Sequence, residues 1–235
     1  MKRIAFGLFM LTGMLRPAWA QPGEADTLFL QAALSRTESD YQNTFARQSR
    51  LFNGSEYHEY YGRDDEHPYF REDWAEGSVY YDGNLYHQVN LLFDMSSGQL
   101  ITENGYHNAI QLVDEKVSWF RIGNHTFRAL RNEKIPKGFY LVAYDSTTKV
   151  YMLQTKALQQ RNTYSGIEVR FEEKTSIYLL KDGNFWPVKS KKSVLNALAD
   201  QRPYLKKAMK GRKPFSANRL ENICHMARLY DRQQP

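Results

Sequence analysis

Alternating apolar and polar residues dominate the middle of the chain, from about residue 56 to residue 188. Every second residue from Leu85 to Phe93 would share one face of a strand, because strand side chains point alternately to its two sides. Turn signals separate such segments at short intervals, namely Tyr81-Asp82-Gly83-Asn84, Ser96-Ser97-Gly98, Gly123-Asn124, Asp145-Ser146 and Lys181-Asp182-Gly183-Asn184. Because no long helical intervals allow parallel crossovers, the pattern predicts an antiparallel β-meander of about eight to ten strands that can curve into a half-barrel.

Helical spacing replaces this alternation after Pro187. Residues 190–232 predict three short helices, with Ser190 or Ser193 capping the first and Ser216 capping the third. Together with an N-terminal helix, these elements predict the fold class α+β, mainly β, with the helices flanking an antiparallel sheet.

The first twenty residues have the pattern of a secretory leader. Lys2 and Arg3 precede an apolar run from Ile4 to Leu15, and Ala18-Trp19-Ala20 supplies the small residues of a cleavage site. The apolar run is shorter than the roughly 20 residues that a membrane-spanning helix needs. We therefore expect cleavage between Ala20 and Gln21, a secreted or periplasmic location, and no transmembrane segment in the mature chain.

Residues 21–235 are expected to form a single domain. Apolar residues recur every three or four positions over residues 27–50, which predicts an amphipathic helix. The sheet of residues 56–188 follows, and the helical tail of residues 190–232 packs on it. The single cysteine, Cys224, excludes an internal disulfide, and its helical apolar surroundings favour a buried, inert thiol over a reactive one.

Charge is unevenly distributed along the mature chain. Removal of Lys2, Arg3 and Arg16 with the leader leaves 29 basic and 26 acidic side chains, a net charge of +3. From Lys189 to the end there are twelve Lys and Arg residues against three acidic ones, so the preceding mature region is net negative. Such a basic tail can be a solvated pair of helices, or it can dock on an envelope protein or an anionic membrane surface. The candidate docking residues are Lys206, Lys207, Lys210, Arg212 and Lys213.

Five segments occur in an order that resembles an uncharacterised family of exported proteins of Bacteroidota-type bacteria. They are Leu51-Phe52-Asn53-Gly54-Ser55-Glu56-Tyr57, His67-Pro68-Tyr69-Phe70, Gly77-Ser78-Val79-Tyr80-Tyr81-Asp82-Gly83, Leu91-Leu92-Phe93-Asp94 and Lys189-Ser190-Lys191-Lys192-Ser193. The resemblance covers most of the mature chain. It implies a secreted or periplasmic protein and no particular activity.

Aromatic residues make up 14% of the chain, enough for a core and for the walls of a pocket. The strand faces that carry Leu85, Val89, Leu91, Phe93, Val117 and Trp119 can line an apolar cavity or form a filled core, and the filled core is the favoured alternative. If the sheet is a carrier, the candidate ligand-binding residues are Tyr81, Tyr86, Phe93, Trp119 and Trp186. Its ligand would then be an apolar molecule.

The densest polar segment runs from His58 to His67 and holds two histidines and four carboxylates. Its spacing matches neither a zinc-protease helix nor a calcium-binding loop, so solvated loop charge is the favoured explanation. If the segment binds a metal ion, the candidate ligands are His58, Asp64, Asp65 and His67.

No catalytic residues are assigned, because the chain carries neither a nucleophile elbow nor a paired-carboxylate arrangement that could straddle a bond. We expect no cofactor, and export argues against a nucleic-acid partner. The sequence thus predicts an exported, non-catalytic binding or carrier protein of the cell envelope. A module that docks through the basic C-terminal helices is the alternative, and a hydrolase that uses the segment from His58 to His67 is a second alternative.

Overall fold

A computed structural model of the protein describes residues 29–37, 50–58, 67–164, 166–211 and 215–233. The chain divides into two units, residues 1–37 and 38–235. In the first unit, residues 29–37 are helical and lie within the helix expected for residues 27–50. The expected leader and residues 38–49 lie outside the described residues.

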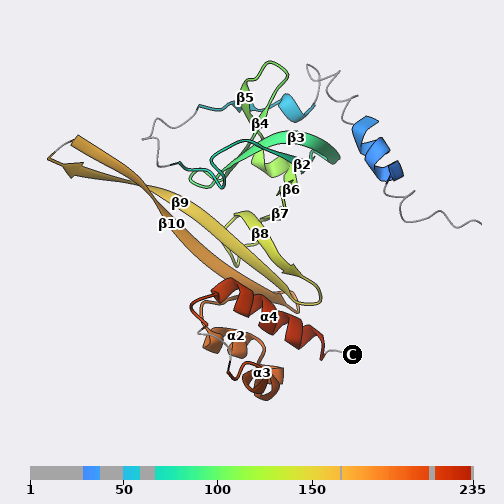
Figure 1. Ribbon diagram of the computed structural model, residues 1–235, viewed down its shortest axis with the longest axis vertical. Helices are drawn as coiled ribbons and strands as arrows, with labels where there is room; N and C mark the ends of the chain where they lie inside the picture. The colour runs from blue at the N-terminus through green and yellow to red at the C-terminus, as the bar shows by residue number, and fades with distance from the viewer. Residues whose placement is uncertain (1–28, 38–49, 59–66, 165, 212–214, 234–235) are drawn as a thin grey trace, which may run out of the picture. The chain divides into compact units, whose positions relative to one another are not determined.

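The second unit is built on one antiparallel sheet of eleven strands in the order β1-β5-β4-β3-β2-β6-β7-β8-β9-β10-β11 (Figure 1). The strand bounds are β1 (Ser55–Glu56), β2 (Ala75–Tyr81), β3 (Asn84–Asp94), β4 (Gln99–Glu103), β5 (Ala109–Gln111), β6 (Val117–Ile122), β7 (His125–Leu130), β8 (Gly138–Asp145), β9 (Lys149–Thr163), β10 (Gly166–Lys181) and β11 (Asn184–Pro187). Meanders run outward from β2 in both directions, and the edge strands β1 and β11 do not pair with each other. The predicted α+β, mainly β class is confirmed, as an open sheet. Strands are more numerous than expected because β1 and β5, with two and three residues, are too short to show an alternating pattern.

Two Asp-Gly turns close the β2–β3 and β10–β11 hairpins, as predicted. Asp82 and Asp182 both have a φ of 49°, and each is followed by a glycine that also has a positive φ. Positive φ at both central residues is the geometry of the type I′ turn, whose twist suits a two-residue hairpin. The side-chain amides of Asn84 and Asn184 each donate to the carbonyl of the turn aspartate.

The predicted alternation of faces along β3 is wrong at one point, because the strand contains a bulge. The register with β2 shifts between Gly77 and Ser78, and Gln88, which has a φ of 53°, has no partner in that register. Beyond the bulge, Tyr86 joins the buried face that the sequence assigned to Leu85. A bulge inserts one unpaired residue, so every side chain on one side of it changes face.

Gly77 lies next to this bulge, at a point where a larger residue would not fit. A Cβ atom at Gly77 would lie 2.1 Å from the backbone carbonyl oxygen of Arg121 in β6. The close approach of β2 and β6 at this point therefore requires glycine.

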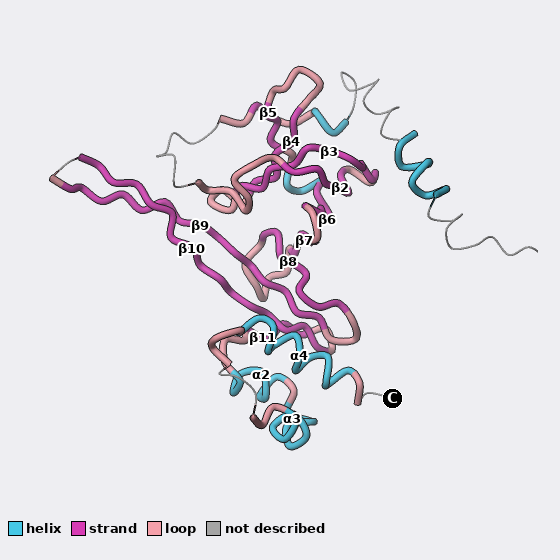
Figure 2. The backbone as a smooth tube through the Cα atoms, in the orientation of Figure 1, coloured by secondary structure: helices cyan, strands magenta, loops and turns pink. Residues whose placement is uncertain are grey.

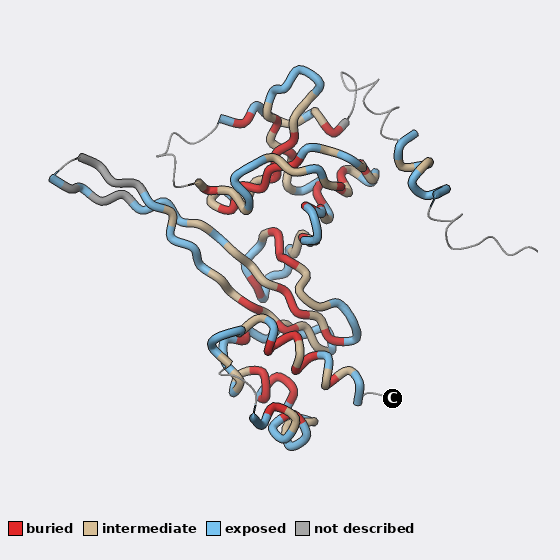
Figure 3. The backbone as a smooth tube through the Cα atoms, viewed as in Figure 1, coloured by how far each residue is buried: buried red, intermediate tan, exposed pale blue. Residues whose placement is uncertain are grey.

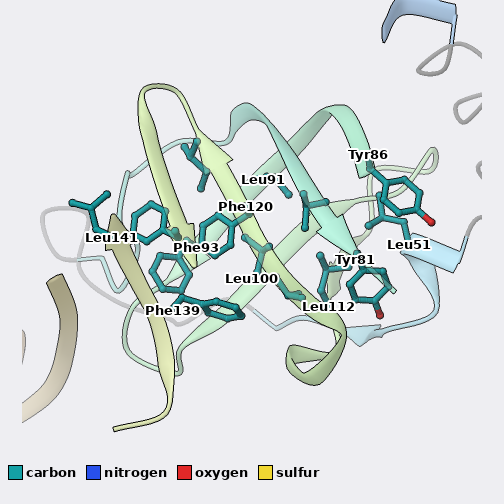
Figure 4. Close-up of a cluster of buried hydrophobic side chains, with 14 of the residues drawn as sticks. Leu51, Tyr81, Tyr86, Leu91, Phe93, Leu100, Leu112, Phe120, Phe139 and Leu141 are labelled. Atoms are coloured by element: carbon teal, nitrogen blue, oxygen red, sulfur yellow. The ribbon is translucent and has the colours of Figure 1, made fainter. Parts of the chain in front are cut away.

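Aromatic rings fill the inside of the curved sheet between β3, β6, β7 and β8 (Figure 4). Phe120 stacks on Phe127 with ring centres 4.8 Å apart, and it meets Phe139 edge-on at 5.2 Å. Phe93 contacts Phe120 at 5.2 Å from the far side of the curve. We call this cluster, with Tyr81, Tyr86, Leu91, Leu100 and their buried neighbours, the inner core.

A second core lies where helices cover the sheet near the start of β9 and the end of β10 (Figure 1). Val150, Ile177 and Leu179 pack there against buried residues of α2 (Lys191–Ala197), α3 (Arg202–Ala208) and α4 (Arg219–Asp231). Met152 in β9 packs against both cores, which links them along the sheet.

The predicted helix starts are partly confirmed. Ser190 caps α2, and it forms a capping box with Ser193. The third helix begins later than predicted, at Arg219, so Ser216 does not cap it. The cap position is taken by Asn218, whose amide donates to Glu221.

The hairpin of β9 and β10 extends beyond its neighbouring strands (Figure 2). β8 pairs with β9 only as far as Met152, and β11 pairs with β10 only from Tyr178 onward. The described part of the extension is largely exposed (Figure 3), and Leu158 and Tyr164 are among its exposed apolar side chains. Lys156 in β9 holds it from the side. Its backbone N–H donates to the carbonyl of Met95, and its ammonium group donates to the carbonyls of His67 at 2.8 Å and Tyr69 at 3.0 Å.

The last residue of α4, Asp231, anchors that helix to the turn between β8 and β9. Its carboxylate accepts hydrogen bonds from the Thr148 backbone N–H at 3.1 Å, the Thr148 hydroxyl at 2.9 Å and the Tyr144 hydroxyl at 2.9 Å. Hydrogen bonds to a charged acceptor are stronger than neutral ones, so this contact defines where the helical layer meets the sheet.

Replacing Asp231 with alanine is therefore expected to lower the free energy of unfolding by about 2–3 kcal/mol, because the donors on Thr148 and Tyr144 lose a charged acceptor. Urea unfolding monitored by circular dichroism measures the change. The matched control is Asp145→Ala in the same turn, which removes only an exposed ion pair with Lys149 and should cost less than about 1 kcal/mol. Equal losses in the two variants would contradict the anchoring role.

Candidate functional site

The five aromatic residues proposed to bind an apolar ligand do not lie together. Tyr81, Tyr86 and Phe93 are buried in the inner core. Trp119 in β6 is half-buried and stacks on Tyr80, with ring centres 6.4 Å apart. Trp186 in β11 is 43% exposed. The structure thus brings three of the five into one packed cluster and places the two tryptophans outside it.

The six strand residues considered as a cavity lining show the same division. Leu91, Phe93 and Val117 are buried in the inner core, and Val89 packs against it. Leu85 and Trp119 are half-buried and do not belong to it. These inner side chains contact one another and support the filled-core alternative.

This division is testable by comparing Phe120→Ala with Trp186→Ala. Phe120 is fully buried among three other phenylalanine rings, so its truncation should lower the free energy of unfolding by about 3–5 kcal/mol. Trp186 is partly exposed, and its truncation should cost less than about 1 kcal/mol. Chemical denaturation measures both changes, and a small loss in Phe120→Ala would indicate that the inner core is loosely packed.

The proposed metal ligands can be placed only in part. His58 is exposed, and His67 is half-buried with its ring stacked on Tyr69 at 6.1 Å. Asp64 and Asp65 lie outside the described residues. In the part of the chain that the structure describes, no group of three histidine, cysteine or acidic residues is close enough to hold a metal ion.

Cys224 lies in the second core, where its thiol points toward the Ala143 carbonyl at 3.7 Å. Burial raises the pKa of this thiol to about 11, although the nearby Arg228 acts in the opposite direction. A thiol with this pKa stays protonated at neutral pH, whereas the thiolate is the nucleophile. Cys224 is therefore a packing residue of the helical layer.

Cys224 should react with Ellman's reagent at neutral pH only after the protein unfolds. The rate in the native protein is expected to be at least about 100-fold lower than in guanidinium chloride, because the thiol is both buried and neutral. Absorbance of the released thionitrobenzoate measures the two rates. Rapid labelling of the native protein would show that the thiol is accessible.

The basic C-terminal segment presents its lysines to solvent. Lys206 and Lys207 in α3 and Lys210 just after it are exposed, as are Lys189 and Lys192 at the start of α2. We call these five residues the basic face. Arg212 and Lys213, the other two proposed docking residues, lie outside the described residues.

Two of the three acidic residues in this segment form contacts with other elements of the protein. Asp200 pairs with Lys181 of β10 at 2.8 Å and accepts a hydrogen bond from the Tyr230 hydroxyl at 2.6 Å. Burial lowers the pKa of Lys181, but the neighbouring Asp200 and Tyr230 outweigh this effect and raise that pKa to about 12. Asp231 is occupied by Thr148 and Tyr144. In the described residues, neither carboxylate forms an ion pair with a lysine of the basic face.

A polar hollow of about 200 Å³ opens on another part of the sheet, between the β3–β4 turn, the 3₁₀ turn Asp114–Lys116 and the chain entering β8. Its charged lining residues are Asp114, Glu115, Arg131 and Lys137, and Phe139 of the inner core also borders it. No sequence pattern groups these residues, since they come from separate turns and share no motif.

Polar contacts shape two walls of the polar hollow. Arg131 donates to the backbone carbonyls of Asp114 and Val117 and holds the 3₁₀ turn in place. The β3–β4 turn is held by Asp94, a fully buried carboxylate that accepts the Ser97 hydroxyl at 2.6 Å and the Tyr57 hydroxyl at 3.0 Å. The hollow is thus bordered by backbone that long-range contacts position.

Comparison of the chain with protein-family models, with curated proteins and with solved structures finds no match in any of the three. No helix in the described parts of the chain has both the length and the apolar character needed to cross a membrane. Functional proposals for this protein therefore rest on its own geometry and charge.

Proposed function

We propose that this protein is an exported, non-catalytic binding protein of the cell envelope that docks reversibly on an anionic lipid surface through its basic face. The observation that carries the proposal is the division of charge in the C-terminal segment. Lys206, Lys207 and Lys210 are exposed, while Asp200 and Asp231 are engaged by partners within the protein. The leader-like N-terminus supports delivery of the protein to the envelope.

The spacing of the lysines suits a flat anionic surface. Lys206 and Lys207 are consecutive residues of α3, and Lys210 follows two residues after the end of that helix. Each lysine close to an anionic membrane contributes about 1 kcal/mol of attraction. Several such contributions give reversible binding without any inserted segment.

Tyr204 favours lipid headgroups over an acidic protein as the partner. It lies in α3 beside these lysines and is 38% exposed. Tyrosine has an apolar ring and a polar hydroxyl, which suits the interface between headgroups and acyl chains. Aromatic and lysine side chains together are typical of proteins that lie on a membrane surface.

The carrier and hydrolase alternatives receive less support from the described residues. Three of the five aromatic candidates for a carrier pocket are packed in the inner core. Of the residues proposed for hydrolysis, His58 is exposed and His67 stacks on Tyr69.

The purified protein should sediment with vesicles that contain phosphatidylglycerol and stay in solution with vesicles of phosphatidylcholine alone. Binding should weaken as salt is raised, because exposed charges are screened over about 10 Å at 0.1 M ionic strength. The triple variant Lys206→Gln, Lys207→Gln, Lys210→Gln should bind on the order of 100-fold more weakly, from about 1 kcal/mol for each lysine lost.

The matched control is Arg128→Gln, Lys134→Gln, Lys174→Gln, which removes the same charge from exposed positions on the sheet and its loops. This control should retain vesicle binding within about threefold, since its residues lie outside the basic face. No binding to anionic vesicles, or equal losses in the two triple variants, would contradict the proposal. Binding to an acidic protein without binding to vesicles would assign the basic face to a protein partner instead.

A further inference from the structure

Two acidic and two basic side chains border the polar hollow, and two of these four have no charged partner in the described residues. Glu115 and Lys137 both border it, and both are exposed. In the described residues, neither forms an ion pair with any other group. Opposite charges that border one cavity without meeting leave space for a ligand between them.

Asp114 has unused hydrogen-bonding capacity at the same place. Its Oδ2 accepts the Gln99 side-chain amide at 3.1 Å, whereas its Oδ1 is buried and has no partner. Burial and the neighbouring Glu115 raise the pKa of Asp114, against the opposing effects of Arg131 and Gln99. A buried carboxylate oxygen without a donor is costly, and a ligand cation near it would offset that cost.

Arg131 also has donors to spare. Its Nη2 atom binds the carbonyls of Asp114 and Val117, which fixes the guanidinium at the edge of the polar hollow. A guanidinium has five N–H donors, so further ones are available to an anionic group.

We propose that the polar hollow binds a small zwitterion, with the charge and size of a free α-amino acid. The ligand's ammonium group contacts the carboxylates of Asp114 and Glu115, and its carboxylate contacts Lys137 and the remaining donors of Arg131. A ligand with only one charge meets attraction from one pair and repulsion from the other. The volume of about 200 Å³ is below the roughly 300–1,000 Å³ of pockets for drug-sized molecules, which selects a ligand with few atoms.

This site is separate from the basic face, which lies on the C-terminal helices. The hollow is formed by the β3–β4 turn, the 3₁₀ turn before β6 and the chain leading into β8. Binding at one surface is therefore testable without the other.

The experiment is isothermal titration calorimetry of the purified protein with three probes. L-alanine carries both charges, L-alaninamide lacks the carboxylate, and N-acetyl-L-alanine lacks the ammonium group. L-alanine should give a saturable heat, and each single-charge probe should bind about tenfold or more weakly because it loses one charge-assisted contact. Absence of a saturable heat for L-alanine, or equal binding of all three probes, would overturn the proposal.

Neighbouring residues of the same type provide matched variants. Lys137→Gln and Glu115→Gln change residues that border the hollow, whereas Lys134→Gln and Glu133→Gln change exposed residues of the same charge that do not border it. The first two variants should weaken L-alanine binding about tenfold or more, while the other two should leave it unchanged. Thermal unfolding of all four verifies that the fold is intact. Equal effects of the two lysine variants, or of the two glutamate variants, would show that a general surface charge, and not this hollow, acts on the ligand.

Discussion

The remaining architecture depends on one constraint: aromatic side chains on the inner face of the curved sheet must pack against one another. Phe93 meets Phe120, Phe127 and Phe139 across the curve, although these residues come from four different strands. Each ring buries a large apolar area, and edge-on or stacked pairs add about 0.5–1.5 kcal/mol each. The sheet must bend for these contacts to form, and the bulge at Gln88 supplies an irregularity at which a strand can bend.

The filled interior has a consequence for function. Where aromatic side chains occupy the inside of a curved sheet, they stabilise the fold and do not line a cavity for an apolar ligand. The polar hollow and the basic face lie instead at turns and on helices. The polar hollow borders the inner core at Phe139, and the basic face lies on the helices that cover the far end of the same sheet.

Charge is organised by the way the helices attach. Asp200 and Asp231 connect the helical layer to β10 and to the β8–β9 turn, through Lys181 and Thr148. The same contacts that hold the helices in place give these two carboxylates partners other than the lysines of the basic face. Among the described residues, the lysines of the basic face are therefore exposed without an ion pair to Asp200 or Asp231.

Local chemistry is what the sequence by itself determined. The Asp-Gly turns at residues 82–83 and 182–183, the antiparallel pairing and the start of α2 at Ser190 all depend on preferences within a few residues. Only the tertiary structure decided that Tyr86 faces inward and that Asp114 and Lys137 border one hollow. Both outcomes depend on a bulge or on contacts between strands that are far apart in the sequence. Such contacts are set by the whole sheet, so the sequence around each residue carries no periodic pattern that predicts them.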